Sequence, residues 1–264
     1  MTPAEAIVQT LLAEITNVLG DRLVGLYIYG SLAQGDFDPQ ASDIDLVAVT
    51  TTPLSWLYLR RLQTMHAALD AVHPEWPELI DIQYLPLEAL QQPTRPTGLI
   101  AMQRPGTNFH SATRVDRLLV AYHVRDAGRA VTGPAPTTIV APITPAQVQF
   151  HSGAELVTWP EYMQTTHDLA FQTFLILTIC HKLYTAHHGR LTSKPQAAVW
   201  AADLYPRKAP IIHAALEWRQ GHTEGVDPES TYPGTVAFIN FMIDEIRAVP
   251  TLPTSPQKRY NQQV

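Results

Sequence analysis

The sequence predicts two domains: an α/β (α+β) N-terminal domain with a small mixed sheet, then an all-α helical bundle. Up to about residue 110, short apolar runs alternate with helical periodicity. A stretch rich in proline and threonine follows at residues 133–145, and only helical periodicity comes after it. We therefore expect domains at residues 1–140 and 141–250, with a flexible polar tail at residues 251–264.

Hydrophobic spacing predicts each element of the N-terminal domain. Residues 2–5 read Thr-Pro-Ala-Glu, which is typical of a capping box with proline in the first helical turn. Apolar residues at helical spacing then carry a helix to Leu19. Short apolar runs predict strands at residues 23–29, 44–49 and 79–85, and a longer amphipathic segment predicts a helix at residues 55–72.

Helical periodicity dominates from residue 113 onward. It predicts one helix at residues 113–130, before the proline-rich linker. Beyond the linker, the same periodicity predicts a bundle with helices at residues 145–156, 165–187, 194–204, 209–220 and 236–248.

The composition narrows the class of protein. The chain has 264 residues, of which 45% are hydrophobic and 16% charged, as in globular proteins. A net charge of -6 argues against non-specific nucleic-acid binding and is compatible with a cationic small-molecule partner. A single cysteine, Cys180, excludes an internal disulfide. We see neither a signal peptide nor an apolar run long enough to span a bilayer, so we expect a cytoplasmic monomer that binds no membrane.

The segment with most chemical information runs from a Gly30-Ser31 turn to the Asp43-Ile44-Asp45 motif. Side chains alternate along a strand, so Asp43 and Asp45 point to one face. Two neighbouring carboxylates repel unless a cation lies between them, and hard oxygen ligands suit Mg²⁺. Gly30 allows close backbone approach to a phosphate, and Ser31 supplies donors at the start of a helix. These parts favour phosphoryl-type transfer.

A third carboxylate, Asp81, lies among apolar residues of the third predicted strand. A buried charge there is costly without a partner. If this strand lies beside the second, Asp81 can face the same metals as Asp43 and Asp45, or accept the proton of an attacking hydroxyl. Taken singly, a Gly-Ser pair or an Asp-x-Asp motif is common in solvated loops. The ordered combination is what indicates function.

This combination resembles the DNA polymerase beta-like nucleotidyltransferase superfamily, whose signature is Gly-Ser, Asp-x-Asp and a distal carboxylate. The helical half resembles the C-terminal domain of streptomycin/spectinomycin (aminoglycoside) adenylyltransferases. That likeness is carried by residues 175–186 (LILTICHKLYTA), by residues 189–194 (GRLTSK), and by the alanines and Trp200 after them.

The resemblance implies transfer of AMP from ATP to a hydroxyl of an aminoglycoside-like molecule, and hence antibiotic resistance, with Mg²⁺ as cofactor, two ions in all. It implies that Asp43 and Asp45 bind the metal. Asp81 stands at the position of the catalytic base, usually a glutamate, and metal ligation is the rival role. The residues it implies for ATP phosphates are Gly30, Ser31, Ser42 and Lys194.

The acceptor region departs from the family pattern. The family has a tryptophan and an acidic residue near the start of the long helix, where this chain has Tyr162 and Phe171. Asp168, one turn before Phe171, can take the acidic role or cap the helix. Two alternatives stay open: a nucleotidyltransferase that acts on a protein or another metabolite, and a nucleotide-binding module without turnover.

Overall fold

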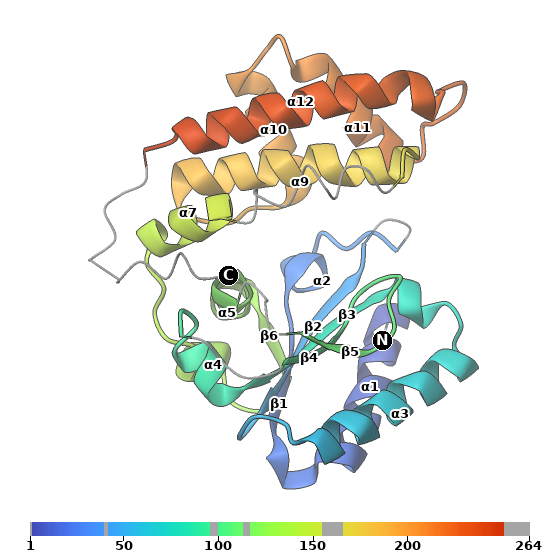
Figure 1. Cartoon of the computed structure of the whole chain (residues 1–264), viewed down its shortest axis with the longest axis vertical. Coiled ribbons are helices and arrows are strands. Elements are labelled where there is room, and N and C mark those ends of the chain that lie inside the picture. Colours follow the sequence, from blue (N-terminus) through green and yellow to red (C-terminus); the bar gives the residue numbers. More distant parts are fainter. Residues whose placement is uncertain (1, 40–41, 96–99, 113–116, 155–165, 251–264) are drawn as a thin grey trace. The chain divides into compact units, whose positions relative to one another are not determined.

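The computed structural model describes residues 2–39, 42–95, 100–112, 117–154 and 166–250. The chain divides into two compact units, Met1–Pro142 and Ile143–Val264. The first holds a mixed sheet with helices and the second is helical, so the predicted fold class is confirmed (Figure 1). The predicted tail at residues 251–264 lies outside the described residues, as does Tyr162.

In the described part of the first unit, six strands form a sheet in the order β5-β4-β3-β2-β1-β6. Only β2 and β3 pair in parallel, because helix α3 carries the chain back to the starting edge between them. The other neighbours are antiparallel. The strands are β1 (Leu23–Ile28), β2 (Ile44–Thr50), β3 (Ile80–Pro86), β4 (Ile100–Gln103), β5 (His110–Ala112) and β6 (Arg129–Thr132).

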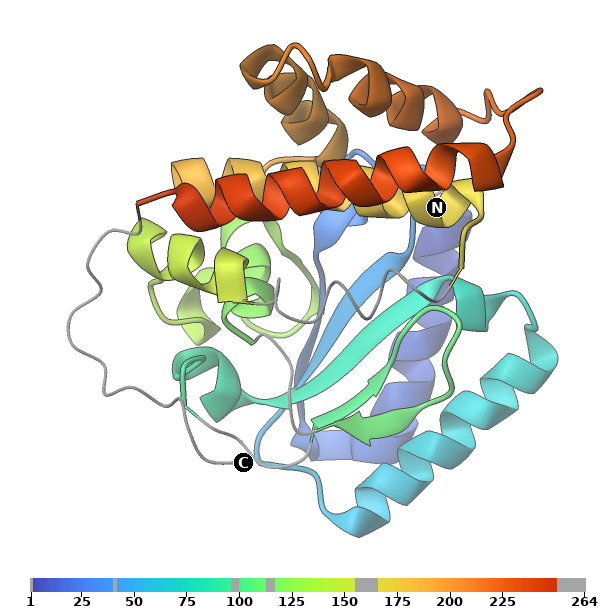
Figure 2. The same ribbon diagram turned by 45° about the horizontal axis from the view of Figure 1, so that its top comes forward.

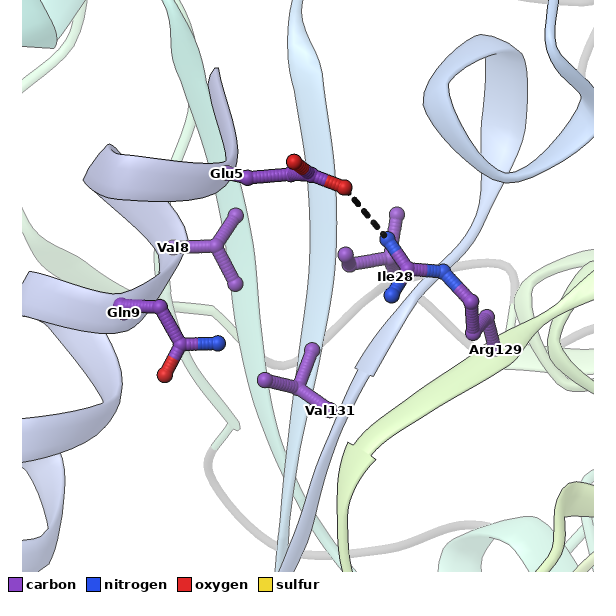
Figure 3. Close-up of a pocket in the computed structure, with 6 residues that line it drawn as sticks. All are labelled: Glu5, Val8, Gln9, Ile28, Arg129 and Val131. Atoms are coloured by element: carbon purple, nitrogen blue, oxygen red, sulfur yellow. Dashed lines mark ion pairs between the residues drawn. The ribbon is translucent and has the colours of Figure 1, made fainter. Parts of the chain in front are cut away.

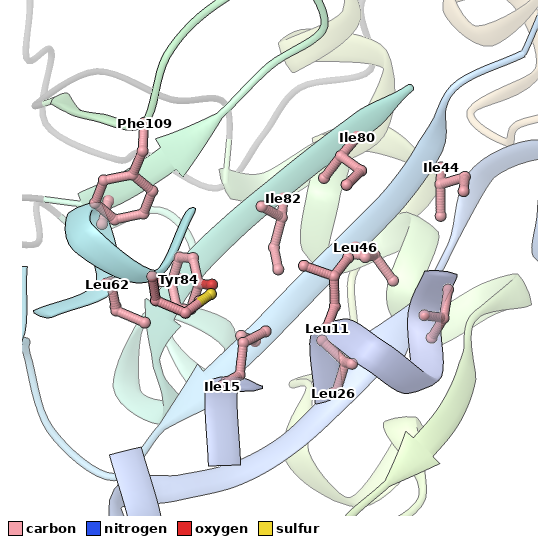
Figure 4. Close-up of a cluster of buried hydrophobic side chains, with 14 of the residues drawn as sticks. Leu11, Ile15, Leu26, Ile44, Leu46, Leu62, Ile80, Ile82, Tyr84 and Phe109 are labelled. Carbon is pink, nitrogen blue, oxygen red and sulfur yellow. The ribbon is translucent and has the colours of Figure 1, made fainter. Parts of the chain in front are cut away.

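The two faces of the sheet in this unit pack against different helices. Helices α1 and α3 lie together on one face, where Figure 4 shows their apolar side chains meeting those of the strands. The other face carries Tyr29, whose ring lies 5.8 Å from that of His123 on α5. The helices are α1 (Pro3–Leu19), α2 (Gly30–Gln34), α3 (Trp56–Val72), α4 (Leu87–Gln91), α5 (Arg117–Ala127) and α6 (Pro136–Ile139), with 3-10 turns at Gly20–Arg22 and Trp76–Glu78.

Alternation along the strands separates an apolar face from a polar one. Leu26, Leu46 and Ile82 point to α1 and α3 and are fully buried in the core. Their neighbours Tyr29, Asp45, Asp81 and Gln83 therefore point to the opposite face, which is the face that α2 and α5 approach (Figure 2). Asp45 and Asp81 of the predicted site thus share one side of the sheet with Tyr29 and Gln83.

Three strands are absent from the sequence-based prediction. The helix predicted at residues 113–130 ends at Ala127 in the structure; Gly128 follows, and β6 then pairs with β1. Residues 113–116 lie outside the described part. Strands β4 and β5 were also missed. All three have four residues or fewer, so their own sequence carries little periodicity and pairing with neighbours decides their conformation.

In the described part of the second unit, α9 is the central helix and packs against α7, α10, α11 and α12. Its start differs from the prediction because Asp168 caps it, so it begins at Leu169 and not at residue 165. Helix α12 begins earlier than predicted, at Pro228, and includes Pro233 near its start. The helices are α7 (Pro145–Ala154), α9 (Leu169–His188), α10 (Lys194–Leu204), α11 (Ala209–Arg219) and α12 (Pro228–Ala248).

Helix α9 also corrects the expectation that no apolar run is long enough to span a bilayer. By length and composition it qualifies, with a mean hydropathy of 1.2 over an 18-residue window. However, 56% of that window is buried inside the structure. Leu175, Ile176 and Ile179 are fully buried against the neighbouring helices. Its apolar composition is accounted for by its position as the core helix of the bundle.

His66 on α3 generates a stability prediction. It stacks on Phe109, and its Nε2 lies 2.7 Å from the Tyr84 hydroxyl. Burial lowers the pKa of His66 from 6.5 to about 4. On acidification the unfolded chain binds this proton first, so stability falls as the pH drops from about 6.5 towards about 4. We expect His66→Gln to remove about 2 kcal/mol of the difference in unfolding free energy between pH 7 and pH 5.

Urea denaturation of wild type and His66→Gln at both pH values measures this difference. Glutamine keeps a hydrogen-bonding group near Tyr84 but does not titrate. Equal pH dependence in the two proteins would contradict the prediction.

Candidate active site

The parallel pairing of β2 with β3 brings the three acidic residues together. Asp45 and Asp81 are direct register partners on the two strands, and Asp43 lies two residues before Asp45 on the same face. One carboxylate oxygen from each of the three lies within 4.8 Å of the others. Among the described residues, this is the one cluster of three or more His, Cys, Asp or Glu side chains at that spacing.

Asp81 is half-buried, and this burial affects its ionisation. Burial raises its pKa to about 6; Arg104 opposes this rise, and Asp43 adds to it. Its Oδ1 atom is buried and has no hydrogen-bond partner among the described residues. Buried polar atoms are nearly always satisfied, so this oxygen fits a ligand such as a cation. The donor set, three carboxylates with one orphaned oxygen, suits a hard divalent ion.

The Gly-Ser turn lies directly against this cluster. Strand β1 ends at Ile28, Tyr29 precedes α2, and Gly30 adopts a positive φ of 64°. A Cβ atom at Gly30 would lie 1.9 Å from the Asp45 carboxylate oxygen, so only glycine leaves room for it. The Ser31 hydroxyl is buried and also lacks a partner among the described residues. Ser31 follows Gly30 in the chain and Asp81 is the register partner of Asp45, so both orphaned polar atoms belong to residues next to this contact.

Ser42 forms hydrogen bonds with Asp38 in the same loop. Its hydroxyl accepts a hydrogen bond from the Asp38 amide at 3.1 Å, and its own amide donates to the Asp38 carbonyl at 2.8 Å. These bonds shape the loop that leads into Asp43. The sequence-based assignment of Ser42 to ATP phosphates stays a prediction.

The remaining predicted site residues belong to the helical unit. Lys194 opens α10, and its ammonium lies 4.8 Å from the centre of the Phe174 ring. The carboxylate of Asp168 caps α9 by accepting a hydrogen bond of 2.7 Å from the Phe171 amide. The capping role that the sequence allowed for Asp168 is thus present.

Sequence reasoning missed three residues beside the acidic cluster: Tyr29, Gln83 and Arg104. Burial raises the pKa of Tyr29 well above its ordinary value, and Asp45, Asp81 and Asp43 raise it further. Its hydroxyl accepts a hydrogen bond of 3.5 Å from Gln83. Alternation from Asp81 could have identified Gln83, and the position directly before the Gly30-Ser31 turn could have identified Tyr29. Arg104 gave no signal, because it follows β4, a strand that was not predicted.

A separate pocket of about 220 Å³ lies on the opposite, α1 side of the sheet (Figure 3). It contains an exposed ion pair of 3.9 Å between Arg129 and Glu5. It holds none of the three clustered aspartates, so it is distinct from the candidate site. Its lining residues are Glu5, Val8, Gln9, Ile28, Arg129 and Val131.

Comparison with protein families finds one match in each of the two units. Residues 12–81 match the nucleotidyltransferase domain, a range that includes the Gly-Ser turn and all three aspartates. The chain belongs to the nucleotidyltransferase superfamily. Residues 152–245 of this nucleotidyltransferase match the C-terminal domain of aminoglycoside adenylyltransferases.

Solved structures show the same fold. The nucleotidyltransferase is similar to spectinomycin adenyltransferase AAD(9) from Enterococcus faecialis, solved with ATP and spectinomycin. The TM-score is 0.72 at 17% identity, over 91% of this chain and 98% of the other. A toxin–antitoxin structure with AMP-PNP also aligns, at 12% identity over 61% of this chain and 94% of that one. Its TM-score of 0.29 is too low to support any argument.

The contact between Gly30 and Asp45 generates a prediction with a matched control. Gly30→Ala places a methyl group on the Asp45 carboxylate, whereas Gly35, with a φ of 78°, has nothing within 4 Å of an added Cβ. Both alanine variants accept the left-handed conformation at a cost of about 1 kcal/mol. We expect only Gly30→Ala to lose Mg²⁺ binding, by about tenfold or more, because only there is a carboxylate displaced.

Isothermal titration with Mg²⁺ and thermal unfolding of both variants check this expectation. Equal loss of Mg²⁺ affinity in Gly35→Ala would show that backbone strain, and not the clash with Asp45, is responsible.

Proposed function

We propose that this nucleotidyltransferase transfers AMP from ATP to a hydroxyl of an aminoglycoside-like small molecule, with Mg²⁺ as the metal. The observation that carries the proposal is the cluster of Asp43, Asp45 and Asp81, whose oxygens lie within 4.8 Å of one another beside the Gly30 turn. Such a cluster fits the charge neutralisation that phosphoryl transfer requires. We propose that residues 1–140 form the nucleotidyltransferase domain and that residues 141–250 form the helical C-terminal domain.

The metal would be held by Asp43 and Asp45, with Asp81 as a further ligand or as the base. When bound, Mg²⁺ polarises phosphoryl oxygens and neutralises charge on the triphosphate. The number of ions proposed is two. The orphaned Oδ1 of Asp81 and the hard oxygen donors support this assignment.

The chain's own residues would position the reactants. The Gly30 backbone and the unpartnered Ser31 hydroxyl, at the start of α2, suit the phosphates. We assign Ser42 and Lys194 to the same phosphates. The acceptor oxygen forms a bond to the α-phosphorus while the bond to the pyrophosphate oxygen breaks. Asp81 takes the hydroxyl proton, a role that its raised pKa of about 6 supports.

The acceptor proposed is a small hydroxylated molecule, in line with the fold shared with a spectinomycin adenyltransferase. Modification of such a drug would give antibiotic resistance. Tyr162 and Asp168 are our candidates for acceptor binding. The Asp168 carboxylate accepts the capping hydrogen bond and a second one, of 2.9 Å, from the Thr166 hydroxyl. Its two oxygens can accept further hydrogen bonds from a substrate. We propose a cytoplasmic, monomeric enzyme.

Pyrophosphate release tests this function. Purified protein is incubated with ATP, Mg²⁺ and a panel of aminoglycosides, and labelled AMP identifies the product. Release that depends on an aminoglycoside supports the proposal. Label transferred only to proteins or metabolites of a cell lysate would show that the acceptor is one of these and not an aminoglycoside. Nucleotide binding without transfer to either would reduce the chain to a binding module.

Removal of one carboxylate charge tests the metal assignment. We expect Asp43→Asn and Asp45→Asn each to lower kcat roughly a thousandfold, because a lost metal ligand removes several kcal/mol of charge stabilisation. Asp21→Asn makes the same charge change in the exposed turn that precedes β1, at the end of the strand away from the cluster, and serves as control. Circular dichroism reports the fold. Normal turnover in both site variants would defeat the assignment.

A further inference from the structure

Arg104 continues the row of charged residues across the sheet. Strand β4 pairs with β3 in antiparallel register, with Ile82 opposite Gln103. One further step of that register places Arg104 opposite Asp81, which in turn is the partner of Asp45 on β2. Asp45, Asp81 and Arg104 therefore stand side by side at the ends of three adjacent strands.

The side chain of Arg104 shares the face of the acidic cluster. Its neighbour Gln103 points the other way, towards α3, where it donates to Asp70 at 3.4 Å. Alternation then directs Arg104 to the side of Asp81. Its charge reaches both Asp81 and Tyr29, because it opposes the rise in pKa that burial causes at each of them.

The guanidinium of Arg104 is available to a ligand. Arg104 is exposed, and its side chain has no hydrogen bond or ion pair with the residues that the structure describes. Its backbone, in contrast, is fixed by Thr107, whose hydroxyl bonds to both its amide and its carbonyl. A guanidinium on an anchored backbone presents a fork of donors suited to oxygen atoms.

The order of the strands places Arg104 on the acceptor side of the cluster. Gly30 and Ser31 follow β1 and lie against Asp45, whereas Arg104 lies beyond Asp81, on the opposite side of the acidic row. In phosphoryl transfer the attacking and leaving oxygens are roughly in line through the phosphorus. If the pyrophosphate leaves on the Gly30 side, the acceptor hydroxyl comes from the side of Asp81 and Arg104.

We propose that Arg104 determines acceptor specificity by hydrogen-bonding an oxygen atom next to the hydroxyl that receives AMP. This inference rests on the proposed function and deepens it. An arginine at this position favours acceptors in which a hydroxyl, carbonyl or carboxylate flanks the reacting hydroxyl. It disfavours acceptors with an ammonium group there, because like charges repel.

A binding measurement first separates the acceptor side from the phosphate side. The affinity of a non-hydrolysable ATP analogue with Mg²⁺ is compared in wild type, Arg104→Gln and Ser31→Ala. Arg104→Gln should bind the analogue within about twofold of wild type, and Ser31→Ala about tenfold more weakly. A loss of about tenfold in Arg104→Gln would place Arg104 on the phosphates and overturn the proposal.

Initial rates of AMP transfer then test the acceptor class with paired acceptors that differ only in an oxygen or an ammonium beside the reacting hydroxyl. Arg104→Gln should lower kcat/KM for the oxygen-flanked member about ten- to a hundredfold and leave KM for ATP unchanged. The ammonium-flanked member should lose nothing. Arg60→Gln, on the far face of the sheet, is the control of equal charge change.

The outcomes separate this inference from the proposed function. A wild type that transfers AMP to no member of the panel contradicts the proposed function, and the inference falls with it. An active wild type with an equally active Arg104→Gln variant, or with equal losses on both members of a pair, contradicts this inference alone.

Discussion

The parallel register between β2 and β3 is the constraint on which the site depends. It sets Asp45 directly beside Asp81, a like-charge pair that is unfavourable in a sheet by itself. The pairing is held by the other face of the same strands, where Leu46 and Ile82 are completely buried. A slip of one residue would turn those apolar side chains towards the polar face and an aspartate into the core. Burial of these apolar side chains therefore holds the carboxylates of Asp45 and Asp81 close together, and a bound cation would reduce their repulsion.

Two buried polar residues near the cluster, Tyr29 and Gln83, carry no charge. Tyr29 lies on the same face of the sheet as the aspartates, and its raised pKa keeps the phenol neutral, so it adds no further negative charge. Gln83 is also neutral and buried beside it. Tyr29 and Gln83 are thus polar but uncharged neighbours of the cluster, whereas Arg104 adds a positive charge that acts on Asp81. Among the described residues, the carboxylates that act on Tyr29 are those of Asp43, Asp45 and Asp81.

The sequence predicted the parts of the fold and site that short-range patterns encode. Strands β1, β2 and β3 are apolar runs of six or seven residues, and Gly30, Asp43 and Asp45 lie within one contiguous segment. What escaped prediction depends on tertiary contacts. Strand β6 is half-exposed and contains an arginine, so its sequence alone did not distinguish it from the end of a helix. The early start of α12 was missed because Pro233, ordinarily a helix breaker, lies within its first two turns.

This division has a physical consequence for function. Apart from Lys194, the groups proposed for ATP and metal come from residues 30–45 and from Asp81, all within the range that matches the nucleotidyltransferase domain. Arg104 comes from the end of a four-residue strand whose position is decided only by pairing with β3. Most groups proposed for the chemistry are thus encoded in one short segment, with Asp81 added by strand pairing, whereas the proposed acceptor side depends on sheet pairing alone. If Arg104 acts as proposed, a single cation beside Asp81 selects the hydroxyl that accepts AMP, while other residues hold ATP and the metal.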